Sequence, residues 1–203
     1  MRNNYKNKKE GFTLIETLIG VAIFVLIVGV LTLFSRNVWI YNSFIGAELN
    51  NTNIGKQAIK TMIAEIRTAS AANTGAYAIG AASATSFTFY SDIYDNGLKE
   101  KVKYFLIGTT LQKSVIKPTG SPMSYNGASE VITTLVSNVT NSSIFDYYDK
   151  NYDGTTAALG APIDLSAVRL VKITITIDLN TNNSPAPATF STQVTLRNLK
   201  DNL

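Results

Sequence analysis

Few residue types in this chain of 203 residues could carry out catalysis. It contains no histidine and no cysteine, which excludes Ser-His-Asp and Cys-His arrangements, zinc–thiolate sites and disulfides. Paired carboxylates occur only in segments that read as loops, and nothing in the sequence indicates a cleft around them. The composition therefore argues against an enzyme.

One acidic segment has the spacing of a metal-binding loop. Asp149-Lys150-Asn151-Tyr152-Asp153-Gly154 places oxygen ligands at alternate positions before a glycine, as in the first half of a calcium loop. The twelfth position, where a bidentate glutamate is expected, is Gly160. Because such residues also favour ordinary turns, the segment fits either a calcium site at Asp149, Asn151 and Asp153 or a plain turn. No other cofactor is expected.

The second candidate for chemistry is a carboxylate inside an apolar segment. From Phe12 to Phe34 every residue except Glu16 is apolar, small or hydroxylated. A carboxylate at the centre of a membrane helix costs about 2.5–3.5 kcal/mol, so such residues are usually paired or functional. A secretory signal peptide is cleaved after its apolar segment, at small residues. Processing at Gly11 would instead leave the apolar segment in the mature protein.

The segment Lys8-Lys9-Glu10-Gly11-Phe12-Thr13-Leu14-Ile15-Glu16 resembles the N-terminal signal of type IV prepilins and of the pseudopilins of type II secretion systems. The resemblance implies that a membrane prepilin peptidase cuts between Gly11 and Phe12 and methylates the new amine of Phe12. It also implies that Glu16 neutralises this amine on a neighbouring subunit. The alternative for Glu16 is a carboxylate that only reaches toward the lipid headgroups.

The apolar segment is long enough to cross a membrane as a helix, since about 20 apolar residues span a bilayer core. Four basic residues against one acidic residue precede Phe12, which keeps that end in the cytoplasm. The remainder has 14 basic and 13 acidic residues, so nucleic-acid binding receives little support. We expect a single-pass protein of the cytoplasmic membrane whose body lies outside it, and the resemblance implies that it then enters an extracytoplasmic filament.

Hydrophobic periodicity predicts an α+β fold. Ile54, Ala58, Met62 and Ile66 recur every four residues, so the helix should continue as an amphipathic segment. Beyond it, alternation and β-branched residues predict antiparallel strands. The expected strands are 86–91, 101–107, 111–116, 143–148, 168–179 and 190–199, with 130–136 as a strand or short helix. Residues 71–85, 120–127 and 180–187 are expected to be loops.

The sequence thus predicts a leader at 1–11, a transmembrane half-helix at 12–35, an amphipathic half-helix at 36–72 and a β-rich domain at 73–203. In this fold the long N-terminal helix packs on an antiparallel sheet. The resemblance implies a structural subunit of a type IV pilus or a type II secretion pseudopilus, with the peptidase, other subunits and the membrane as partners. Size, irregular loops and a C-terminal likeness to J-type pseudopilins favour a minor subunit. The alternative is a membrane-anchored binding module that does not polymerise.

Overall fold

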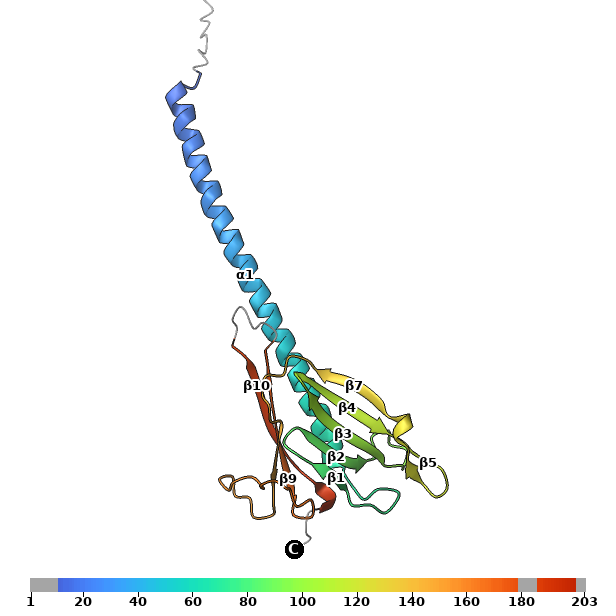
Figure 1. Ribbon diagram of the computed structural model, residues 1–203. Helices are drawn as coiled ribbons and strands as arrows, with labels where there is room; N and C mark the ends of the chain where they lie inside the picture. Colours follow the sequence, from blue (N-terminus) through green and yellow to red (C-terminus); the bar gives the residue numbers. More distant parts are fainter. Residues whose placement is uncertain (1–10, 179–185, 200–203) are drawn as a thin grey trace, which may run out of the picture. The chain divides into compact units, whose positions relative to one another are not determined.

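The computed structural model describes residues 11–178 and 186–199, and the chain divides into two compact units, residues 1–46 and 47–203. Helix α1 (Leu14–Arg67) contributes its first part to one unit and its second part to the other. The β-strands belong to the second unit (Figure 1). An N-terminal helix followed by antiparallel sheet confirms the α+β prediction.

The first part of α1 has the composition and length of a membrane span. Among the described residues, Leu14–Ser43 is the one stretch that meets this test, with a mean hydropathy of 2.8. Three of its hydroxyl groups bond back to helix carbonyls: Thr17 donates to Leu14, Thr32 to Val28 and Ser43 to Ile40. Side chains that bond their own helix present fewer unpaired polar groups to lipid. The segment is therefore compatible with an apolar solvent.

In the second unit the described strands form two main antiparallel sheets and a small hairpin. The larger sheet has the order β1 (Ile79–Ala82), β2 (Ser86–Ser91), β3 (Glu100–Ile107), β4 (Thr110–Ile116) and β7 (Val131–Val136). The smaller sheet has the order β10 (Ala188–Thr195), β9 (Leu170–Ile177) and β8 (Phe145–Tyr148). Strands β5 (Pro118–Thr119) and β6 (Ser124–Tyr125) pair with each other, and Gly127–Ser129 and Arg197–Leu199 are short 3-10 helices.

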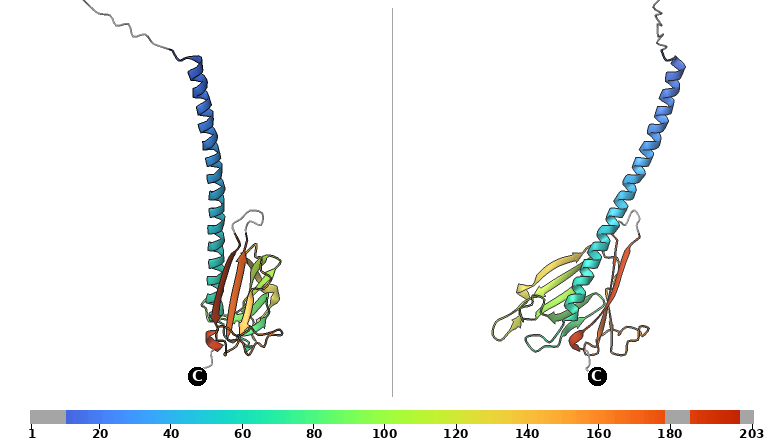
Figure 2. Two further views of the ribbon diagram at one scale, coloured as in Figure 1. Left: turned by 90° about the vertical axis from the view of Figure 1, so that its left-hand side faces the viewer. Right: turned by 180° about the vertical axis from the view of Figure 1, so that it is seen from behind.

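The core of this unit lies between one face of α1 and the two sheets. In the views from front and back the second part of α1 runs between β10 and the larger sheet, and the view turned by 90° shows it on one side of both sheets (Figure 2). The predicted helix stripe supplies Ala58, Met62 and Ile66, which are buried. The sheets meet through aromatic side chains, with the rings of Phe87 and Tyr147 5.5 Å apart between centroids. Each buried aromatic or aliphatic side chain contributes roughly 1.5–3 kcal/mol, so the stripe is a major source of stability.

The two strands predicted from alternation are present as β9 and β10, but the expected strand 190–199 ends at Thr195 and Arg197–Leu199 is a 3-10 helix instead. In β9, Val171, Ile173, Ile175 and Ile177 are buried while the intervening side chains are partly exposed. The register of β9 with β10 places Ile175 opposite Phe190, so the apolar side chains of both strands face the core. The turn between β3 and β4 uses Gly108 with a φ of 59°, a conformation that glycine adopts without strain.

Four details differ from the prediction. Helix α1 ends at Arg67 rather than at residue 72, because the Thr68 hydroxyl bonds back to Ala64 and Glu65 and the Ser70 amide pairs with Tyr90 of β2. The expected loop 71–85 contains β1, and the expected loop 120–127 contains β6. The strands also divide into two sheets, and this division was not predicted. The expected loop 180–187 lies mostly outside the described residues.

Gly55 permits a close approach between α1 and the Phe190 ring of β10. A Cβ atom at this position would lie 2.4 Å from the Phe190 ring. We predict that Gly55→Ala destabilises the protein, since overpacking costs about 1–3 kcal/mol. In a Phe190→Ala background the same change should instead stabilise it by up to ~1 kcal/mol, the helix-propensity advantage of alanine.

Chemical unfolding of the wild type, the two single variants and the double variant in detergent measures this change of sign. Near-ultraviolet circular dichroism reports the unfolding. Gly46 is a matched control, because a Cβ there meets no atom within 4 Å. The packing explanation fails if Gly55→Ala has the same effect in both backgrounds.

Candidate functional site

The N-terminal site residues lie at the start of α1. Gly11 and Phe12 precede the helix, and the Phe12 side chain is 85% exposed. Thr13 and Glu16 form a capping box: the Thr13 amide and hydroxyl donate to Glu16 Oε2 at 3.0 and 2.9 Å. The Glu16 amide in turn donates to the Thr13 hydroxyl at 3.3 Å. Glu16 therefore satisfies backbone groups that the helix itself leaves unpaired.

Thr13 is a site residue that the sequence analysis missed. The signal was present, because a threonine followed three residues later by a glutamate before an apolar run is the capping-box pattern. Both bonds from Thr13 end on Oε2, and Oε1 accepts no hydrogen bond from the described residues. The cap thus fixes the position of the carboxylate and leaves one oxygen for another donor.

The candidate calcium residues lie in the segment between β8 and β9, where their side chains make turn bonds. Asp149 accepts from the Asn151 amide at 2.9 Å and from its side-chain nitrogen at 3.1 Å. Asp153 Oδ1 accepts from the amides of Thr155 and Thr156, both at 2.9 Å, and from their hydroxyls. These bonds hold the pKa of Asp153 well below its ordinary value. The described part of the chain contains no group of three or more His, Cys, Asp or Glu side chains placed to hold a metal.

Calcium binding at Asp149, Asn151 and Asp153 stays a prediction. A calcium site there would raise the melting temperature of the full chain in calcium but not in magnesium, because the ion binds only the folded loop. Asp153→Asn, which keeps the acceptor oxygen, should reduce the shift. Equal melting temperatures in calcium and in a chelator would instead assign the segment to plain turns.

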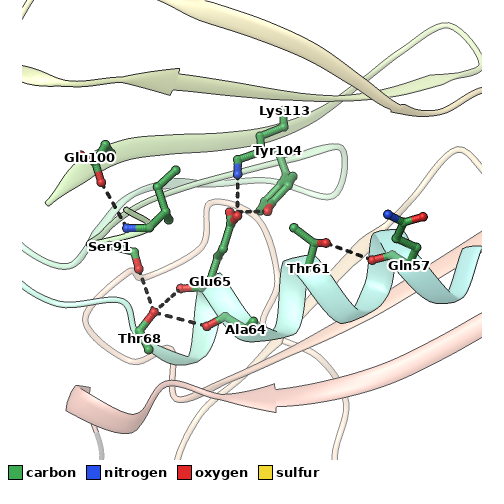
Figure 3. Close-up of polar contacts among 10 residues, drawn as sticks. Gln57, Thr61, Ala64, Glu65, Thr68, Ser91, Glu100, Tyr104 and Lys113 are labelled. Carbon is green, nitrogen blue, oxygen red and sulfur yellow. Dashed lines mark hydrogen bonds and ion pairs between the residues drawn. The ribbon is translucent and has the colours of Figure 1, made fainter. Parts of the chain in front are cut away.

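A buried polar contact joins α1 to the larger sheet. Glu65 accepts from the Tyr104 hydroxyl and from Lys113 Nζ, both at 2.5 Å, and the Glu65 and Lys113 side chains are each 14% exposed (Figure 3). Burial, followed by the neighbouring Glu65 charge, raises the pKa of Tyr104 far above its ordinary value. At the end of the helix the Thr68 and Ser91 hydroxyls lie 2.8 Å apart. The bonds of Glu65 fix the rotation of the helix against the sheet.

Glu100, at the start of β3, is fully buried. Its Oε2 accepts from the Ile93 amide at 3.1 Å, and its Oε1 is buried without a hydrogen-bond partner in the described structure. Burial raises the pKa of Glu100 above its ordinary value of 4.5, and the nearby negative charge of Asp92 adds to the shift. Sequence reasoning did not single out this residue, since a lone glutamate at a strand start gives no pattern.

The raised pKa of Glu100 predicts a specific pH dependence. Above pH 4.5 the unfolded chain loses this proton before the folded chain does, so the free energy of unfolding falls as pH rises toward the raised value. Glu100→Gln cannot titrate at this position. Its free energy of unfolding relative to that of the wild type should therefore rise over that pH interval. Urea unfolding at several pH values measures the difference between the two proteins. A difference that stays constant from about pH 3 to 7 would contradict the assignment.

Comparison with known proteins finds similarity at the N-terminus. Residues 6–32 match a family model described as the prokaryotic N-terminal methylation motif, and this range contains Gly11, Phe12, Thr13 and Glu16. No curated protein matches the chain significantly. The motif supports a type IV pilin-like or pseudopilin protein in general, and together with the apolar helix it is consistent with membrane anchoring.

Proposed function

We propose that this protein is a structural subunit of a type IV pilus or a type II secretion pseudopilus. A prepilin peptidase cleaves it between Gly11 and Phe12 and methylates Phe12. The leader stays in the cytoplasm, α1 crosses the membrane, and the β-rich unit lies outside. The subunit then joins other pilins or pseudopilins through α1 in an extracytoplasmic filament.

The observation that carries this proposal is the methylation motif at 6–32, joined to a membrane-compatible helix with one carboxylate near its start. The motif contains the proposed cut, the amine that the cut creates and Glu16. A simple lipid anchor has no need of a carboxylate there, because the charge opposes insertion. A subunit that packs helix against helix gains from it, since the carboxylate neutralises an ammonium group that is costly alone.

The geometry at the helix start suits this pairing. The capping box holds Glu16 by Oε2, and Oε1 remains available among the described residues. The Phe12 ammonium group of a neighbouring subunit would donate to Oε1 without breaking the cap. The Glu16 carboxylate would then cap the start of its own helix and set the axial position of the helix of the neighbouring subunit.

The motif favours a structural role over a catalytic one. A minor subunit fits better than an abundant one, because the β8–β9 segment and the β5–β6 hairpin are irregular additions to the two sheets. A membrane-anchored binding module that never polymerises is the alternative, and the Glu16 variants separate it from a subunit.

Two substitutions at Glu16 test assembly. Glu16→Gln keeps the capping box, because glutamine serves at the same position, but it removes the charge; Glu16→Ala removes both. We expect both variants to enter the membrane and to lose most incorporation into sheared filaments, measured by immunoblot of the filament and membrane fractions. For a protein that is only a membrane anchor, neither substitution would change its distribution between the two fractions. Loss with Ala but not with Gln would assign Glu16 to capping alone.

Intact mass tests processing. The native protein should begin at Phe12 and be heavier than the unmodified chain by one methyl group. Finding the leader still attached to the membrane-extracted protein, or α1 removed with it, contradicts the proposal. A Gly11→Leu variant is the control, because a large side chain at the proposed cut should leave the leader in place.

A further inference from the structure

A groove of about 620 Å³ runs between the second part of α1 and β10. Half-buried apolar side chains of Ile59, Ile63 and Phe190 contribute to its lining. All of its residues belong to the second unit, so the groove is a feature of that unit alone. Its apolar lining provides a surface on which a partner could bury side chains.

The groove is positively charged. Lys56, Lys60 and Arg67 line it, are exposed, and follow one face of the helix at spacings of four and seven residues. None of the described acidic residues lines the groove, and Glu65 of the same helix is turned to Tyr104 and Lys113. Among the described side chains the one ion pair is that of Glu65 with Lys113, so the three cations have no carboxylate partner there.

The groove also borders a sheet edge. Among the described strands, β10 is the end strand of its sheet and pairs with β9 alone. Residues Thr189–Thr192 of β10 contribute to the groove lining. An end strand offers unpaired backbone amides and carbonyls to an added extended segment. The charge and the edge together favour an acidic segment that lies outside helices and strands as the ligand.

The same chain carries such a segment. Residues 149–164 contain three aspartates against one lysine, while Leu159 and Ile163 among them pack against the core of their own unit. These residues form turns, bends and irregular chain, and none of them belongs to a helix or strand. Asp153 and Asp164 are exposed, and bonds from Thr155 and Ser166 lower the pKa of each, so both are charged at neutral pH. The segment is tied to its own sheet by the Leu159 amide, which donates to Tyr147 O at 2.8 Å.

We propose that the α1–β10 groove of one copy binds the 149–164 segment of a second copy. The inference rests on the proposed function, because it names a contact between assembled subunits. Groove and segment are different surfaces, so each copy that binds one neighbour still presents both surfaces to others. Such head-to-tail contacts are heterologous, so two copies that make one contact do not close into a symmetric dimer.

The absence of cysteine from the chain makes a direct test possible. Ala64→Cys in the groove and Ala157→Cys in the segment are exposed positions that leave every charge in place. The two full-length variants, carrying different tags, are expressed together, oxidised in the membrane and in filaments, and separated without reductant. We expect a mixed disulfide dimer in several-fold excess over the pair Thr119→Cys with Ala157→Cys, in which the first cysteine lies on exposed β5.

Charge reversal tests the chemistry of the contact. Lys60→Glu in the groove chain should lower the mixed dimer roughly tenfold, since like charges across an interface cost more than a kilocalorie per mole. Asp153→Lys in the segment chain should do the same, and the two reversals together should restore the dimer. Asp153→Asn keeps the turn acceptor and should give an intermediate loss, which separates charge from loop folding.

The outcomes distinguish this inference from the proposed function. Filaments that depend on Glu16 but give no mixed dimer above the Thr119 control overturn the groove contact and leave the subunit assignment intact. Loss of the dimer without rescue by the double reversal also overturns it. A disulfide within one chain carrying both cysteines, with no mixed dimer, would place the segment in its own groove. Absence of any Glu16-dependent filament overturns the proposed function itself.

Discussion

The change in the surface of α1 along its length is the constraint on which the rest depends. Its first part is apolar in every direction, and its second part buries the single stripe Ala58, Met62 and Ile66. An all-round apolar helix suits lipid or a helical bundle, whereas a one-sided stripe needs a folded partner. The two sheets provide that partner, since the helix stripe and the inner faces of both sheets form one core cluster.

Hydrophobic burial brings the helix to the sheets but does not fix its rotation, because the attraction has no direction. The polar contacts supply the direction. Glu65 meets Tyr104 and Lys113 in an environment that is largely closed to water, and leaving Lys113 there without a partner would cost several kilocalories per mole. Gly55 adds a steric condition, since only a residue without Cβ fits against Phe190. With the rotation fixed, Lys56, Lys60 and Arg67 border the α1–β10 groove while Glu65 points away from it.

The sequence predicted elements whose signal is local. Alternation in Val171–Ile177 and the four-residue stripe of α1 depend only on neighbours along the chain, and both predictions are confirmed. β1 was missed because Ile79-Gly-Ala-Ala lacks β-branched residues after the first, and its pairing with β2 makes it a strand. The buried Glu100 and the contacts of Glu65 depend on residues far apart in the chain, so no local pattern could reveal them. The capping partner Thr13 was predictable, because Thr13 and Glu16 before an apolar run form the local capping-box pattern.

Glu16 shows how one side chain can meet two demands. A carboxylate in an apolar helix is tolerated near the end of the span for two reasons. The cost of its charge is lower there, and it can accept hydrogen bonds from helix amides that have no partner within the helix. The capping box makes it part of the local fold of every copy, assembled or not. In the proposed assembly, Oε1, which accepts no hydrogen bond from the described residues, would bind a neighbour's ammonium without a rearrangement, so the residue would be ordered before assembly begins. Preorganisation of this kind lowers the entropy that association must offset, which is why a carboxylate held by its own helix suits a subunit better than a freely rotating one.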